Sequence, residues 1–79
     1  MKQDLLAPQM TRAEQETEIE ANRLIEQIEG ALAVVAVNSL DGVNSLEAAA
    51  DRIERASRDL AFALRELAQS RRVAEDETE

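Results

Sequence analysis

The chain has 79 residues, no cysteine and no histidine, and its nine basic and seventeen acidic residues give a formal net charge of −8. A chain of this length forms one small domain at most, and without cysteine it can build neither disulfides nor thiolate zinc sites. Without histidine it also lacks the usual general base at neutral pH. We therefore expect no enzyme, cofactor or metal site. The negative charge disfavours nucleic acids and anionic membranes as partners.

The composition favours an all-helical protein. One proline, two glycines and a single aromatic residue, Phe62, are too few for the turns and strand pairs of a β-sandwich or barrel. Alanine, glutamate, leucine and arginine dominate, as is typical of long helices and coiled coils. The longest apolar run, residues 31–37, is far shorter than the roughly 20 residues that span a membrane. No targeting signal is visible, so we expect a cytoplasmic protein.

The first predicted helix covers residues 11–37, after an irregular leader at residues 1–10. Thr11 and Glu14 have the spacing of a capping box, in which each side chain binds the other residue's backbone N–H. Gly30 interrupts the apolar pattern, and it indicates either a kink or close crossing, or simply a tolerated glycine. Apolar residues then recur at helical spacing, at Ala21, Leu24, Ile25, Ile28, Ala31, Leu32 and Val35.

A turn is predicted at residues 38–44, because Asp41-Gly42 is a strong turn dipeptide. The second predicted helix covers residues 45–72, with Asn44 as its N-cap and arginines in its last turn. The residues that follow, 74–79, are too rich in charge to bury anything, and we expect them to be disordered. The helical-hairpin domain thus occupies residues 11–73.

Two stripes with a seven-residue repeat run along the second helix. One is large (Leu46, Ile53, Leu60, Leu67) and its neighbour is small (Ala49, Ala56, Ala63). A small stripe beside a large one lets another helix approach closely, so this segment is built to pair. We predict an all-α antiparallel hairpin of two long helices, which dimerises into a four-helix bundle or coiled-coil-like assembly.

The predicted oligomer interface uses the apolar stripes of both helices, and more than one orientation of the two hairpins is compatible with them. A larger oligomer, or a monomer completed by its target, is the alternative to the dimer. The interface residues are Leu24, Ile28, Leu32, Val35, Leu46, Ala49, Ile53, Ala56, Leu60, Ala63, Leu64 and Leu67.

Two apolar features lie off these stripes and are candidates for binding another protein. Phe62 lies on a charged side of the second helix near Arg58 and Arg65, an arrangement that resembles a protein-binding hot spot. The second feature is the turn end, with Val37, Leu40 and Val43. For Phe62 the alternative is a second oligomer contact or an ordinary exposed apolar residue, and for the turn end it is a cap on the bundle's own core or a contact with the second subunit.

The absence of catalytic chemistry leads us to expect a non-enzymatic regulator, an inhibitor or adaptor that docks on a larger protein as a homodimer. In composition alone, the chain resembles short, acidic, cysteine-free helical inhibitors encoded by bacteria and phages. A structural subunit that self-assembles is one alternative. Another is an acidic mimic of nucleic acid, using the glutamates of residues 14–20 and the acids of the tail. The arginines of the second helix are interspersed with acids, so we do not expect it to bind nucleic acid.

Overall fold

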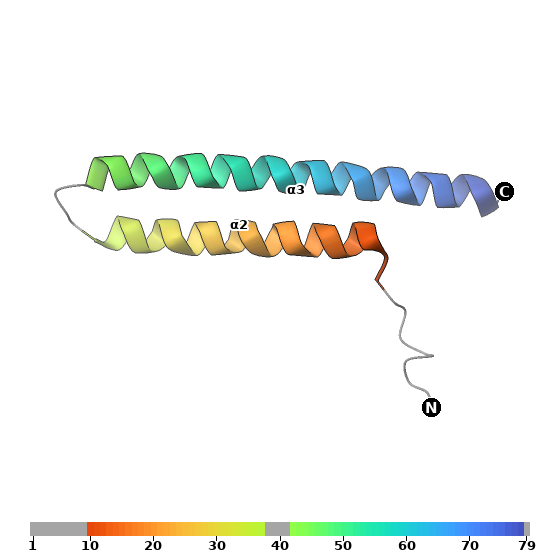
Figure 1. Ribbon diagram of the computed structural model, residues 1–79, viewed down its shortest axis with the longest axis horizontal. Helices are drawn as coiled ribbons and strands as arrows, with labels where there is room; N and C mark the ends of the chain where they lie inside the picture. Colours follow the sequence, from red (N-terminus) through yellow and green to blue (C-terminus); the bar gives the residue numbers. More distant parts are fainter. Residues whose placement is uncertain (1–9, 38–41, 79) are drawn as a thin grey trace, which may run out of the picture.

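The computed structural model describes residues 10–37 and 42–78, which form two helices in antiparallel orientation. Helix α2 covers Arg12–Ala36 and helix α3 covers Gly42–Thr78. They lie side by side along their lengths, and α3 extends past the start of α2 (Figure 1). The described residues contain no strand. The predicted all-α helical hairpin is therefore confirmed for one chain.

Helix α2 begins with the capping box that the sequence predicts. The Thr11 hydroxyl accepts the backbone N–H of Glu14 at 3.1 Å, and the Glu14 carboxylate accepts the backbone N–H of Thr11 at 2.9 Å. Both donors would otherwise have no partner inside the helix. Helix α2 ends at Ala36, and the N–H of its C-cap residue, Val37, donates to the carbonyl of Val34 at 3.2 Å.

Gly30 lies within α2, which runs through this position without a break (Figure 1). A Cβ atom built on Gly30 would meet no atom within 4 Å. No close crossing with α3 therefore depends on this glycine, and the structure favours the tolerated glycine over a packing role.

Helix α3 is longer at both ends than the sequence indicated. It starts at Gly42, so Asn44 lies inside its first turn, and it continues to Thr78 through residues expected to be a disordered tail. Ala74 is a strong helix former, and Glu75 follows Arg71 by one turn, a spacing of opposite charges that supports a helix. The predicted leader, apart from Met10, and residues 38–41 lie outside the described residues.

The contact between the helices is narrow and built from small side chains. Among the described residues only Ala49, Ala56 and Ala63 are buried, with 5%, 9% and 6% of their surface exposed. They face a line of half-buried positions on α2 that includes Thr17. The Thr17 hydroxyl donates to the Ala13 carbonyl of its own helix at 2.9 Å and lies 3.4 Å from the Ala63 carbonyl of α3. A side chain reaches the backbone of the other helix because alanine leaves room for the helices to approach. The hairpin therefore has almost no core of its own.

Candidate protein-interaction faces

The heptad spacing divides the hairpin into two faces. At 100° per residue, a residue four positions after a buried alanine lies on one side of the helix contact, and a residue three positions after it lies on the other. On α3, Ile53 and Leu60 take the first kind of position, and Arg52 and Asp59 the second. On α2, which has no buried residue, the count starts from the half-buried Leu24: Ile28 lies four positions after it and Gln27 three. Because the helices are antiparallel, the apolar sides of both fall on one face of the hairpin.

We call this surface the apolar face. Its side chains are only partly covered by the other helix, and the large ones most open to solvent are 43 to 69% exposed. Isolated exposed apolar residues are ordinary on protein surfaces, but a contiguous set marks a contact site. The face consists of Leu24, Ile25, Ile28, Leu32 and Val35 from α2, and Val43, Leu46, Ile53, Leu60, Leu64 and Leu67 from α3.

The opposite surface, the charged face, carries two shallow clefts that bridge the helices. One is lined mainly by ionic side chains of both helices, among them Glu26, Arg52 and Arg55. The other lies beside Phe62 and Ile19, with Glu16, Glu20, Arg23, Asp59 and Ala63 around them. The shared lining shows that these residues of α2 and α3 lie on the same side of the hairpin.

Two ion pairs on this face form within α2. Glu20 binds Arg23 through one carboxylate oxygen, Oε2, at 3.4 Å, and Glu16 binds Arg12 at the same distance. The second oxygen of Glu20, Oε1, is buried and has no hydrogen-bond partner. The exposed Arg12–Glu16 pair contributes little to stability, roughly 0.5 kcal/mol or less.

Phe62 is 64% exposed and lines the second of these clefts. Arg58 and Arg65, predicted as its neighbours in a partner-binding site, are exposed but do not line that cleft. Both lie two positions after a buried alanine, about 200° round the helix, and so on its outer side. The charged groups that line the cleft beside Phe62 are instead Glu16, Glu20 and Arg23 of α2 and Asp59 of α3.

A cleft at the turn end is lined by apolar residues at the end of α2 and by Gly42 and Ser45 of α3. Val37 is 60% exposed and lines this cleft with Val34, Gly42 and residues near them, and Val43 is 69% exposed. Leu40, predicted to belong to this group, lies outside the described residues.

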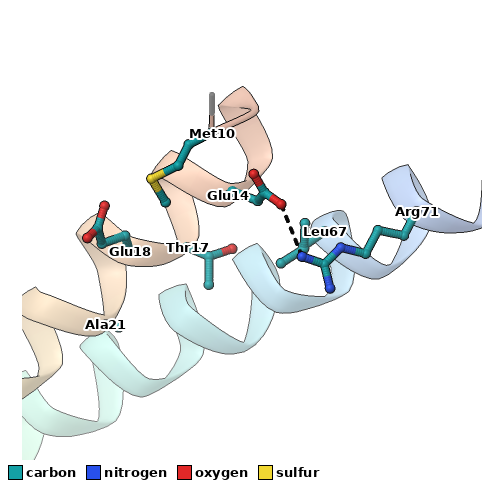
Figure 2. A pocket seen from close by; sticks show the side chains of 7 residues that line it. All are labelled: Met10, Glu14, Thr17, Glu18, Ala21, Leu67 and Arg71. Carbon is teal, nitrogen blue, oxygen red and sulfur yellow. Dashed lines mark hydrogen bonds and ion pairs between the residues drawn. The ribbon is translucent and has the colours of Figure 1, made fainter. Parts of the chain in front are cut away.

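At the open end of the hairpin, an ion pair between the helices lies at the end of the apolar face. Arg71 Nη2 lies 3.1 Å from Glu14 Oε2, in a pocket that Leu67 and Thr17 also line (Figure 2). The backbone hydrogen bond of the capping box and then the bond from Arg71 lower the pKa of Glu14 below its ordinary value. One carboxylate thus caps α2 and links it to α3.

The predicted oligomer-interface residues divide into two groups. Ala49, Ala56 and Ala63 are already covered inside one hairpin. The large residues of the list belong to the apolar face and remain partly or largely exposed in the single chain.

Sequence reasoning missed three contributors to these surfaces. Ile19 lies beside Phe62, and the signal was its isolation among glutamates, on the opposite side of α2 from the apolar pattern. Glu20 lines the same cleft, but the sequence does not distinguish it from the solvated glutamates around it. The Glu14–Arg71 pair depends on the register between the helices, which the sequence of either helix alone does not contain.

No protein family, curated protein or solved structure matches this chain. Within residues 10–37 and 42–78, no group of three or more carboxylates could hold a metal ion. Neither of the two described helices is long and apolar enough to cross a membrane.

Proposed function

We propose that this protein is a non-enzymatic regulator that acts by protein–protein contact, docking as a homodimer on a larger protein that it inhibits or adapts. The observation that supports this proposal is the apolar face, which a single hairpin leaves open to water. A second apolar feature, Phe62 with Ile19, lies on the charged face and would stay accessible after the apolar face is covered. One surface serves the dimer and the other serves the target.

Retention of a partner by the immobilised protein tests this function. The wild type should retain a stoichiometric partner from a lysate of its own cell, identified by mass spectrometry, and Phe62→Ala should lose it. Val73→Ala is the matched control, because Val73 is also an exposed apolar residue of α3 and lies away from the cleft. Retention that is equal in all three proteins would contradict docking through Phe62.

Two other functions remain proposals of lower rank. A self-assembling structural subunit is supported by the exposed valines of the turn end, Val37 and Val43, and it predicts growth beyond the dimer with concentration. Acidic mimicry of nucleic acid has weaker support, because Glu14, Glu16 and Glu20 at the open end are each paired with an arginine. Those pairs lower the negative potential that a mimic needs.

A further inference from the structure

We propose that the apolar face is covered by a second copy of this chain. The turns of the two hairpins lie at opposite ends of the dimer, and Ile28 and Ile53 lie at its two-fold axis. In this arrangement α2 packs on the partner's α2, and α3 on the partner's α3. The inference rests on the proposed function, since it gives the geometry of the homodimer through which that function is exerted.

The need for a second copy follows from how little a single hairpin buries. Its buried residues, within the part of the chain that is described, are three alanines. A chain this small needs disulfides, metals, unusually good helix packing or self-association to stay folded, and it has no cysteine. The exposed large residues of the apolar face are 43 to 69% open to solvent and form the surface that a second copy would cover; a specific interface takes about 800 Å² from each partner. The half-buried residues beside them, Leu24, Ile53, Leu60 and Leu67, add to the surface that a second copy can cover.

Helix α3 is self-complementary about Ile53. When two copies of a helix pack in antiparallel orientation about residue 53, residues whose numbers add to about 106 meet across the axis. Leu46 then meets the partner's Leu60, and Ala50 lies opposite the partner's Ser57. Val43, which is 69% exposed, lies against the partner's Leu64. Large residues thus flank a small pair, which allows close packing.

Helix α2 is self-complementary about Ile28 in the same way. Leu24 meets the partner's Leu32, and Ala21 meets the partner's Val35. The contact of Thr17 with Ala63 shows that residues of α2 and α3 whose numbers add to about 80 lie at the same level. Ile28 therefore lies beside residues 52 and 53, so one two-fold axis can serve both helices at once. The apolar pattern of α2 about Ile28 and that of α3 about Ile53 are therefore both satisfied by the same two-fold axis.

The alternative orientation, with both turns at the same end, fits less well. It would place α2 over the partner's α3 at equal levels. Leu64, which is about half exposed, would then face the partner's Thr17 and Glu18 at the polar start of α2. The open-end ion pair of Glu14 and Arg71 stays outside the interface when the turns lie at opposite ends.

Engineered cysteines test the orientation, because the chain contains none. The full-length Ala50→Cys/Ser57→Cys variant should form a covalent dimer under mild oxidation, seen on a non-reducing gel, and each single variant should stay uncrosslinked. Two cysteines seven residues apart on one helix are about 10 Å apart and cannot bridge each other. Absence of the covalent dimer would overturn the proposal. So would a dimer from Ala21→Cys/Ser57→Cys, the pair that meets when the turns lie at the same end.

A charged residue introduced on each face in turn tests which face of the hairpin contacts the second copy. Leu32 and Phe62 are 65% and 64% exposed in the single chain but lie on opposite faces. Leu32→Glu should raise the dimer dissociation constant by about 100-fold or more, measured by sedimentation, because it places a charge in a desolvated contact. Phe62→Glu should leave it within about threefold, a shift of well under 1 kcal/mol. Equal effects, or an unchanged Leu32→Glu dimer, would overturn the proposal.

Loss of target retention in Phe62→Ala is a separate result, so failure of the dimer geometry and failure of the proposed function can be told apart.

Discussion

The two faces of this hairpin use the same helices and the same seven-residue repeat, yet they are opposite in character. On the apolar face, the repeat places Ile53 and Leu60 four residues after a buried alanine; on the charged face, it places Arg52 and Asp59 three residues after one. The difference shows that alanine at the contact line does more than fill space. It brings the helices close enough that the large side chains are left at the edge of the contact, available to another molecule.

The two faces also differ in whether contact with water is favourable for them. The charged face is largely solvated, and its ion pairs form within one chain. The apolar face leaves large side chains in water, which is unfavourable by about 25 cal/mol per Å² of apolar surface. We therefore expect changes at the contact line to alter both faces together, and changes on the charged face to have small and local effects.

Replacing a buried alanine at the contact line should have the largest effect. Ala56→Leu places three extra carbons where the helices touch, and it should destabilise the folded protein by about 3 kcal/mol because the helices must separate. Chemical denaturation followed by circular dichroism measures this. Ala33→Leu, the same change at an exposed position of α2, should stay within about 0.5 kcal/mol. An equal response at both sites would mean that the alanine line does not set the helix separation.

A change on the open surface of α2 should have a smaller effect, and a stabilising one. Gly30→Ala adds a methyl group that meets no atom within 4 Å, so it should act through helix propensity alone. We expect a gain of about 1 kcal/mol in the free energy of unfolding, seen as a higher denaturation midpoint. A loss of stability would show that Gly30 lies against something in the folded assembly, such as a second copy on the charged face.

The smallest effect concerns the ion pair at the end of the apolar face. Because the pKa of Glu14 is lowered in the folded state, its stabilising contribution is present above the ordinary glutamate pKa of about 4.3. It is lost as the pH falls through the lowered value. The melting temperature of Glu14→Gln should therefore lie below that of the wild type at pH 6, and the difference should shrink below about pH 4. Glu29→Gln, the same change of charge on exposed α2 surface, is the control. A difference that is constant with pH would exclude the ionised carboxylate as its source.

Much of the hairpin could be predicted from the sequence because its determinants are local. The capping box at Thr11 and the apolar spacing each depend on residues within one or two turns. Which of the two stripes lies at the contact line could not be predicted, since both repeat every seven residues and only the approach of the backbones distinguishes them. The end of α3 differs from the prediction, because the helix propensity of Ala74 and the spacing of Arg71 and Glu75 favour a helix despite the charge of the tail. The cleft beside Phe62 needed the register between helices, which only the fold provides.

The most direct test of the account is the mass of the wild-type chain in solution, measured by sedimentation equilibrium from about 1 to 100 μM, together with its helicity over the same range. Covering of the apolar face by a second copy predicts twice the chain mass at the upper concentrations, and helicity that falls as the dimer dissociates on dilution. A fully helical monomer at 100 μM would contradict it, because it would show that three buried alanines suffice to hold the hairpin and that the apolar face needs no second copy.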